Sequence, residues 1–167
     1  ETFGPIGNDK YTEYLGDIHF SARHLLEIIN DVLDMSKIEA GKVELHESEL
    51  NLDETFQSIE MIMSERAARA KVKLHFHVDE GVESLRADSR LVRQMLINLV
   101  ANAVKFSKPN QEVTVSAKLM TDKKYLRISV KDSGCGIPKE KIEKALEPFG
   151  QISDPERSMG QGTGLGL

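Results

Sequence analysis

Apolar residues recur with helical spacing in the first part of the chain. This spacing predicts one long helix from about Asp9 to Ala40, with Gly41 placed where a helix-ending glycine belongs. The apolar positions follow one another at intervals of four and three, the spacing of a heptad seam. They are Ile18, Ala22, Leu25, Ile29 and Val32, flanked by Leu15, Leu26 and Leu33. A helix about 45 Å long by its rise per residue exceeds what a small domain needs, so we expect it to pack on a partner helix.

Two further helices are predicted by the same spacing. One runs from about Asp53 to Ala70, and the other runs from about Asp88 to Phe106. The apolar face of the first is expected to hold Phe56, Ile59, Met63, Ala67 and Ala70. The apolar stripe of the second is expected to hold Leu91, Met95, Leu99, Ala103 and Phe106. Both helices are therefore expected to cover a core with one face.

Strict alternation of apolar and polar residues predicts three strands, at Val72–Val78, Val113–Leu119 and Tyr125–Lys131. The last two are separated by the polar turn Thr121–Lys124, which has hairpin length. A short extended link is expected at Lys42–Leu50. Helices and strands in this order predict a mixed α/β domain behind one long helix.

Two histidines, His75 and His77, fall on the polar face of the first predicted strand. A His-X-His pair can bind a metal, but no third ligand is spaced nearby, so we expect a solvated strand face. Towards the C-terminus a short helix is expected from Pro138, a good first-turn residue. The stretch 150–160 is polar and lacks periodicity, which is typical of a mobile surface loop.

Composition narrows the class of protein. The 167 residues carry 22 Lys and Arg against 27 Asp and Glu, a net charge of −5, which is unsuited to general nucleic-acid binding. The single cysteine, Cys135, excludes an internal disulfide framework and a cysteine-based zinc site. No apolar run approaches the roughly 18 residues of a membrane-spanning helix, and there is no signal-peptide pattern. We therefore expect a cytoplasmic segment without direct membrane contact, whether or not the intact protein is membrane-anchored.

The first cluster that could carry chemistry lies on the third predicted helix. Asn98 and Asn102 are one turn apart, so both carboxamides share a face, and Lys105 follows on the same side. Amide oxygens suit Mg²⁺, and an ammonium group neutralises phosphate. The alternative is a pair of asparagines that bond locally at a solvent boundary.

The second cluster, Asp132–Gly136, comes directly after a predicted strand. A carboxylate at a strand end can accept an exocyclic amine such as that of adenine, and the glycines allow the backbone to approach a flat ring. The alternative is an ordinary Asp-Ser-Gly turn.

The third cluster, Gly160–Leu167, has glycine at alternate positions and could present amide groups to phosphates. It matches neither the P-loop nor the dinucleotide fingerprint, and a flexible tail is the alternative. Taken together, the three clusters predict a Mg²⁺·ATP site closed by a lid at Gly150–Gln161.

These clusters resemble the sequence boxes of sensor histidine kinases. Asn98–Ser107 is similar to their N box, Asp132–Gly136 to the G1 box, Glu147–Phe149 to the F box and Gly162–Leu167 to the G2 box. Upstream, Asn30–Gly41 resembles the end of the second helix of the dimerisation hairpin. The resemblance covers nearly the whole chain.

The stretch from Tyr11 to Ile18 is most similar to the cell-cycle kinases of alphaproteobacteria. The family resemblance implies an α/β (α+β) two-layer sandwich of the Bergerat type, preceded by one long helix. Residues 1–41 would be part of the dimerisation hairpin, and residues 42–167 would be a truncated ATP-binding domain.

The resemblance also implies roles for individual residues. Asn102 would be the main Mg²⁺ ligand with Asn98 assisting, and Lys105 would approach the phosphates. Asp132 would accept the adenine amine. The glycines and neighbouring residues of the boxes complete the implied ATP-binding set: Phe106, Gly134, Gly136 and Ile137 at the base, Phe149 under the lid, and Gly162, Thr163, Gly164, Leu165 and Gly166 at the phosphates.

The implied reaction passes the γ-phosphate of ATP to a histidine on the first hairpin helix and then to an aspartate of a response regulator. The family's phosphoacceptor motif is absent, since neither His19 nor His24 is followed by the expected residues. No catalytic residue is therefore assigned, and we expect a fragment that is inactive alone, from a protein that dimerises through its hairpin.

Two other interpretations compete with a kinase. ATPases of the gyrase, mismatch-repair and heat-shock-chaperone type share the fold but use a carboxylate base about one turn before the asparagine, where this chain reads Gln94–Ile97. A non-catalytic interaction module with a degenerate pocket is the third interpretation.

Overall fold

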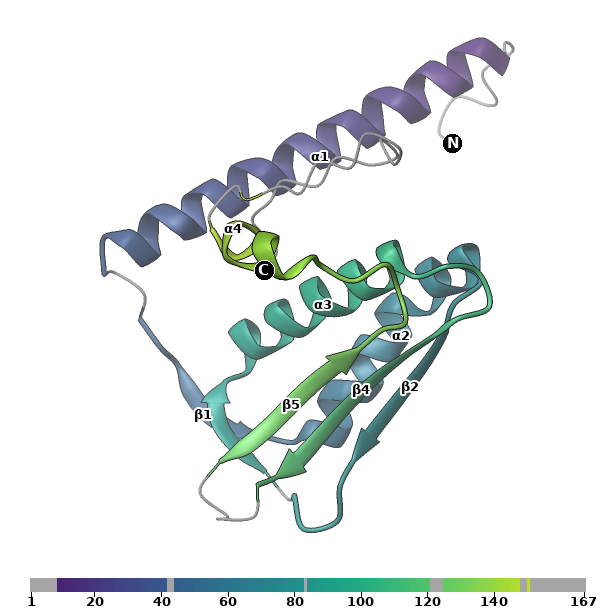
Figure 1. Ribbon diagram of the computed structural model, residues 1–167. Coiled ribbons are helices and arrows are strands. Elements are labelled where there is room, and N and C mark those ends of the chain that lie inside the picture. Colours follow the sequence, from purple (N-terminus) through teal and green to yellow (C-terminus); the bar gives the residue numbers. More distant parts are fainter. Residues whose placement is uncertain (1–8, 42–43, 83, 121–124, 148–149, 151–167) are drawn as a thin grey trace. The chain divides into compact units, whose positions relative to one another are not determined.

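The computed structural model describes residues 9–41, 44–82, 84–120, 125–147 and 150, and it forms two compact units, residues 1–44 and 45–167 (Figure 1). The first unit is the helix α1 (Asp9–Glu39). Gly41 ends it with a left-handed φ of 61°, and its N–H donates to the carbonyl of Ile38 at 3.0 Å. The predicted long helix and its terminating glycine are confirmed.

The apolar seam of α1 is exposed within its own unit. Ile18 is 63% and Leu25 is 58% exposed. The other exposed apolar side chains of this seam are Leu15, Leu26, Ile29, Val32 and Leu33. An exposed row of this length on one helix needs a covering partner. Among the described helices none, α1 included, combines the length and apolar character required to cross a membrane.

The second unit is built on a three-stranded sheet of β2 (Lys73–Val78), β4 (Glu112–Leu119) and β5 (Leu126–Lys131), in the order β2-β4-β5. β2 and β4 are parallel, and β4 and β5 are antiparallel. Parallel neighbours require a crossover connection, which here contains one further strand and a helix. The three predicted strands are confirmed to within a residue at each end.

Two short strands, β1 (Glu47–Leu50) and β3 (Leu85–Asp88), form a separate antiparallel pair. β1 occupies only the last part of the predicted link 42–50, and β3 was not predicted because four residues carry too little alternation to be recognised. The predicted turn 121–124 lies outside the described residues.

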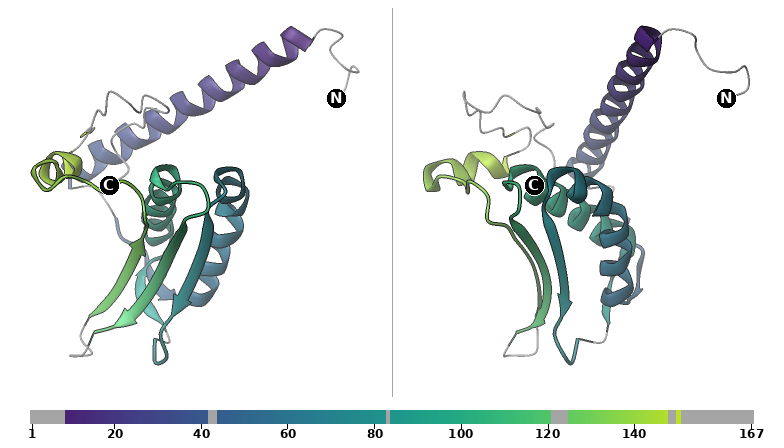
Figure 2. Two further views of the ribbon diagram at one scale, coloured as in Figure 1. Left: turned by 45° about the vertical axis from the view of Figure 1, so that its right-hand side comes forward. Right: turned by 90° about the vertical axis from the view of Figure 1, so that its right-hand side faces the viewer.

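The helices α2 (Leu52–Ala70) and α3 (Ser89–Phe106) pack on one face of the sheet, as Figure 2 shows edge-on. A 3-10 turn, η1 (Lys139–Lys141), and a short helix, α4 (Ile142–Leu146), follow β5. One layer of helices on one layer of sheet is the predicted two-layer sandwich, which is confirmed.

The core lies between these two layers. Its side chains come from α2, α3 and the inward positions of the strands, and the rings of Phe56 and Phe76 meet at a centroid distance of 5.7 Å. The largest fully buried side chains are Leu52, Ile59, Val100, Val104, Val113 and Val115. His75 and His77 lie on the opposite, exposed face of β2, as the alternation predicts.

Of the predicted apolar stripe of α3, Ala103 is buried and Leu91 is half-buried, but the prediction is wrong for the other three residues. Met95 and Phe106 are 56% and 51% exposed, and Leu99 is also exposed. The row that faces the sheet consists of Val92, Leu96, Val100, Ala103 and Val104. Apolar side chains cover most of the circumference of α3, so local spacing permits two overlapping faces. Contact with the sheet selects the face that is rich in compact valine.

Asp88 anchors the start of α3. Its Oδ1 accepts the backbone N–H groups of Arg90 and Leu91 at 3.0 and 3.2 Å, and its Oδ2 accepts the N–H of His46 at 3.1 Å. These bonds, with that from His46 the largest cause, hold the pKa of the buried carboxyl below its ordinary value, against the opposing effect of burial. One carboxylate thus ties α3 to the segment before β1.

We expect Asp88→Asn to lower the melting temperature by several degrees at pH 7, since the amide cannot accept from both sides. A lowered folded pKa contributes stability above the ordinary pKa near 3.8, and this contribution disappears as pH falls through the folded pKa. Thermal unfolding from pH 7 downward should therefore show the difference between the two melting temperatures shrinking once the pH falls below the ordinary pKa. A difference that does not shrink at any pH below that pKa would contradict this role.

Candidate functional site

Asn98 and Asn102 lie one turn apart on α3, on the side away from the residues that face the sheet. Both are half-buried. The core residues Leu96 and Val100 lie on the other side of the helix. Two neighbouring carboxamides present hard oxygen donors of the kind that Mg²⁺ takes. Among the described residues no group of three or more His, Cys, Asp or Glu side chains offers a competing metal site.

Lys105 continues this face towards the C-terminal end of α3. It is half-buried, and its Nζ lies 5.3 Å from the ring centroid of Phe106. Burial lowers the pKa of the ammonium group, and the positive charge of Arg66 on α2 lowers it further. Two cations on adjacent helices suit an anionic ligand. Arg66 was missed by sequence reasoning, because nothing in the local pattern of α2 connects it to a residue on α3.

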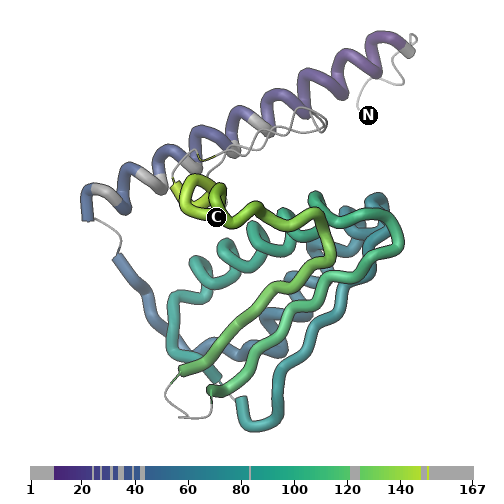
Figure 3. Tube along the Cα trace, in the orientation of Figure 1, coloured from purple at the N-terminus to yellow at the C-terminus, as the bar shows by residue number. Residues whose placement is uncertain are grey.

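The segment after β5 approaches the C-terminal end of α3, where Figure 3 shows the chain leaving β5 before it reaches η1. Asp132 Oδ1 accepts the backbone N–H of Gly134 at 2.7 Å, which closes a tight turn. A Cβ atom on Gly134 would lie only 2.6 Å from the carbonyl oxygen of Phe106 and 2.8 Å from Asp132 Oδ1. The missing side chain of Gly134 is therefore what lets the turn reach the helix.

This contact brings two of the three predicted clusters together. Asp132 is exposed, and within the described part of the chain its second oxygen, Oδ2, has no partner. Gly136 has a left-handed φ of 68°, and Ile137 beside it is 45% exposed. The turn thus presents a carboxylate acceptor and an apolar side chain close to the C-terminal end of α3.

The third predicted cluster lies outside the described residues. Its residues Gly162, Thr163, Gly164, Leu165 and Gly166 are among them, and the same holds for Phe149 and for the predicted lid apart from Gly150. The roles expected for these residues stay predictions.

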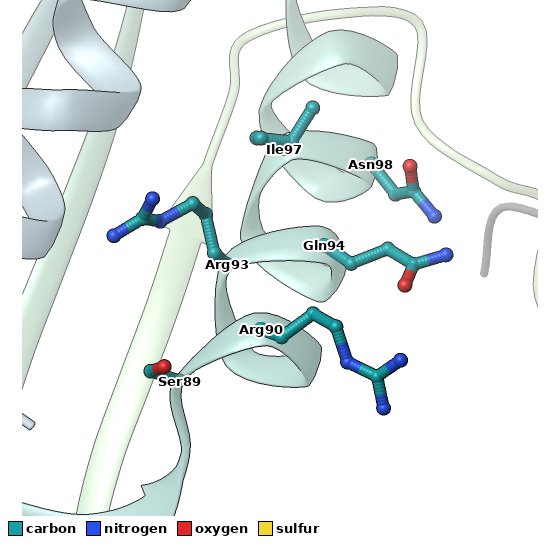
Figure 4. Close-up of a pocket in the computed structure, with 6 residues that line it drawn as sticks. All are labelled: Ser89, Arg90, Arg93, Gln94, Ile97 and Asn98. Atoms are coloured by element: carbon teal, nitrogen blue, oxygen red, sulfur yellow. The ribbon is translucent and has the colours of Figure 1, made fainter.

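An open pocket of about 380 Å³ adjoins Asn98 on α3, lined by Ser89, Arg90, Arg93, Gln94, Ile97 and Asn98 (Figure 4). Arg90, Gln94 and Asn98 point to one side of the helix in this view, and Arg93 points to the other. Sequence reasoning missed both arginines as site residues and considered Gln94 only as part of a stretch without a carboxylate. For Arg90 and Gln94 the signal was the spacing of four residues that continues from Asn102 and Asn98 towards the start of the helix, whereas Arg93 lies outside this spacing.

Comparison with known proteins finds histidine kinases and related ATPases by family, by sequence and by structure. The family described as histidine kinase-, DNA gyrase B-, and HSP90-like ATPase matches residues 87–167. The "Non-motile and phage-resistance protein" of Caulobacter vibrioides is 41% identical over 169 residues, covering all of this chain and 20% of that protein. The cell-division control histidine kinase PdhS of Brucella ovis is 38% identical over 175 residues, covering all of this chain and 17% of PdhS. The chain thus spans about a fifth of the length of these curated relatives.

Solved structures agree with these relatives. Full-length ShkA in complex with AMPPNP superposes with a TM-score of 0.81 at 26% identity, covering 98% of this chain and 33% of ShkA. The catalytic domain of the histidine kinase ThkA, in a nucleotide-free form, superposes with a TM-score of 0.61 at 30% identity, covering 72% of this chain and 75% of that domain. The resemblance to histidine kinases seen in the sequence boxes is confirmed, and the chain belongs to the histidine kinase family.

Proposed function

We propose that residues 42–167 bind Mg²⁺·ATP and form the catalytic ATP-binding domain of a sensor histidine kinase. The observation that carries this proposal is the contact of Gly134 with the carbonyl of Phe106. It supports the proposal because Asp132 lies in a turn at the end of α3, and Lys105, Asn102 and Asn98 follow along the same helix. A base-binding group and phosphate- and metal-binding groups thus occur in one continuous arrangement.

Each described residue has a distinct task in this proposal. Asp132 accepts the amino group of adenine, and Lys105 neutralises phosphate charge. Asn102, assisted by Asn98, would hold Mg²⁺ through amide oxygens, and the cation would supply positive charge to the phosphates. The remaining proposed contacts are those of Phe106, Gly134, Gly136 and Ile137 at the base, of Phe149 under the lid, and of Gly162, Thr163, Gly164, Leu165 and Gly166 at the phosphates.

The described part of α3 favours phosphoryl transfer over ATP hydrolysis. Its exposed face carries Arg90, Gln94, Asn98 and Asn102 at intervals of four, and none of these side chains is a carboxylate. A general base that activates water on this face is therefore missing from the described residues of α3. The phosphoryl group instead passes to a histidine of the hairpin in the intact protein, which relays it to a response regulator.

The first unit, helix α1, also supports the assignment of the chain to a sensor histidine kinase. We propose that residues 1–41 form the second helix of the dimerisation hairpin, because the exposed heptad seam of α1 requires a partner helix. In the intact protein this seam joins a homodimer, and the kinase acts in the cytoplasm, where ATP and response regulators are available.

The proposal is tested by nucleotide selectivity. Asp132→Ala removes the only proposed acceptor for the adenine amine, so the preference for ATP over GTP should be lost, a change of about tenfold or more in relative affinity. Calorimetry with ATP and GTP in the presence of Mg²⁺ measures this directly. Asp79→Ala, which removes a carboxylate that follows β2 instead of β5, serves as the matched control and should keep the preference. If the unsubstituted chain binds no nucleotide at millimolar concentration, the proposed function is wrong.

A further inference from the structure

The three-stranded sheet of the second unit has a polar face opposite the one on which α2 and α3 pack, and in Figure 1 both helices lie behind the strands. The side chains on this face are exposed or half-buried. We call it the outer sheet face and define it by its residues: Lys73, His75, His77 and Asp79 on and directly after β2, Glu112, Thr114, Ser116 and Lys118 on β4, and Arg127, Ser129 and Lys131 on β5. None of these residues has a role in the proposed function.

The register of the sheet brings the charged groups of the outer sheet face together. Lys118 lies directly opposite Arg127, and Lys131 lies opposite Thr114, whose other neighbour is His75. Residues two apart on a strand are about 7 Å apart, and neighbouring strands are about 5 Å apart. The cations of this face therefore share one area that extends about 20 Å along the strands.

The outer sheet face holds more positive charge than its own carboxylates can neutralise. Its four Lys and Arg side chains face two carboxylates, although the whole chain has a net charge of −5. Glu112 Oε1 lies 3.7 Å from His75 Nε2, and Asp79 Oδ2 lies 3.8 Å from Lys118 Nζ. The cations of this face that have no ion-pair partner among the described residues are Lys73, Arg127 and Lys131. Their charges are available to a ligand.

One pair of these cations has an energetic cost in the isolated chain. Lys118 and Arg127 are directly opposite each other on neighbouring strands, and like charges in this arrangement destabilise a sheet. Lysine on an edge strand protects the edge against the addition of another strand, but Lys118 lies on the central strand β4. A ligand with negative charge would remove the repulsion between the two side chains. The pair therefore points to an anionic ligand.

The chemistry of the outer sheet face favours a protein segment over a lipid surface. The three strands place only polar side chains on this face, so nothing there would enter the apolar part of a bilayer. The hydroxyl groups of Thr114, Ser116 and Ser129 lie between the cations and can donate hydrogen bonds to carboxylates. An extended segment with a carboxylate at every second residue repeats at about 7 Å, which is also the spacing of side chains along each strand of this face.

We propose that the outer sheet face is a docking surface for an extended acidic segment of a partner protein. Arg127 and Lys131 on β5, with Lys118 on β4 and Lys73 on β2, attract the carboxylates of this segment. The proposal goes beyond nucleotide binding and does not depend on it, because the two surfaces have no residue in common.

Binding of a synthetic peptide to the whole chain tests the proposal. The probe is a labelled dodecapeptide of alternating Asp and Ser, and the same peptide with Asn in place of Asp is the uncharged control. Only the Asp peptide should bind, and its affinity should fall as salt is added, because salt screens exposed charges. In Arg127→Glu the affinity should fall about tenfold, because an attraction becomes a repulsion, and in the neutral variant Arg127→Gln it should fall about threefold. Fluorescence anisotropy measures these affinities.

Loss of binding can be separated from loss of the fold. Arg127→Glu places opposite charges at the register pair with Lys118, so its melting temperature should be equal to or higher than that of the unsubstituted chain. Arg69→Glu is the matched control, since it makes the same charge change at an exposed position of α2, in the layer of helices. It should keep the affinity for the Asp peptide.

Three results would overturn the proposal. The first is that the unsubstituted chain does not bind the Asp peptide. The second is an equal loss of affinity in Arg69→Glu and Arg127→Glu, which would assign the effect to net charge. The third is binding to phosphatidylglycerol vesicles, lost in Arg127→Glu, that exceeds binding to the peptide, which would assign the face to a lipid surface. Calorimetry with ATP tests the proposed function separately, so either proposal can fail without the other.

Discussion

Gly134→Ala should abolish nucleotide binding while the sheet and helices remain folded. A methyl group at this position would lie 2.6 Å from the carbonyl oxygen of Phe106 and 2.8 Å from Asp132 Oδ1. The first of these atoms belongs to the backbone of a packed helix and cannot give way cheaply. The turn would therefore move away from α3 and carry Asp132 with it. The two halves of the site would separate, although no proposed ligand-binding side chain has been changed.

Calorimetric titration with Mg²⁺·ATP measures the loss, which should exceed about 100-fold in affinity because the base contact and its alignment with the phosphates are lost together. Far-UV circular dichroism should be unchanged. Gly16→Ala is the control, since a Cβ atom there meets nothing within 4 Å. Wild-type affinity in Gly134→Ala would show that the approach of the turn to the helix does not matter for binding.

Asn102→Ala should make nucleotide binding independent of Mg²⁺. Loss of a metal-ligating oxygen weakens the site for the cation by at least about tenfold, since even substitutions in the surroundings of a metal ligand have effects of this size. The remaining affinity for ATP should then be the same with Mg²⁺ and with EDTA. Asn98→Ala should also weaken the dependence of ATP affinity on Mg²⁺, but by less, because we propose Asn98 as the assisting ligand.

Nucleotide titrations with and without Mg²⁺ test this expectation. Gln57→Ala is a suitable control, since it removes an exposed carboxamide from α2 and should keep the full Mg²⁺ dependence. A Mg²⁺ requirement that survives in Asn102→Ala would contradict the assignment of this residue as the main ligand.

The helices and strands could be predicted well because each has a regular pattern over many residues. Which face of α3 is buried could not be predicted from the sequence. Its sequence is apolar at Leu91, Met95 and Leu99 as well as at Val92 and Leu96, and only packing against β4 and β5 decides which row is covered. Periodicity within one element contains no information about the element that will cover it.

In the candidate site, too, some residues could be predicted from the sequence and others could not. Asn98, Asn102 and Asp132 belong to short motifs and were identified from the sequence, whereas Arg66 and Arg90 were not. Arg66 acts on Lys105 from another helix, and Arg90 is recognised only once Asn98 has been placed at a pocket. The glycine at 134 was expected to allow close approach to a flat ring. The structure gives it a contact with the backbone of α3, and the approach to a ring stays a prediction.

The parallel pairing of β2 with β4 has a consequence for how the molecule folds. β4 and β5 follow each other closely in the sequence and can pair early, but β2 pairs with β4 only after the crossover through β3 and α3 has closed. The proposed ATP site lies where α3 meets the end of β5, so it is complete only at a late stage of this sequence of events. A ligand that binds there stabilises contacts that form late, and so it slows unfolding far more than it speeds folding. Nucleotide would then protect the domain chiefly by prolonging the lifetime of its native state.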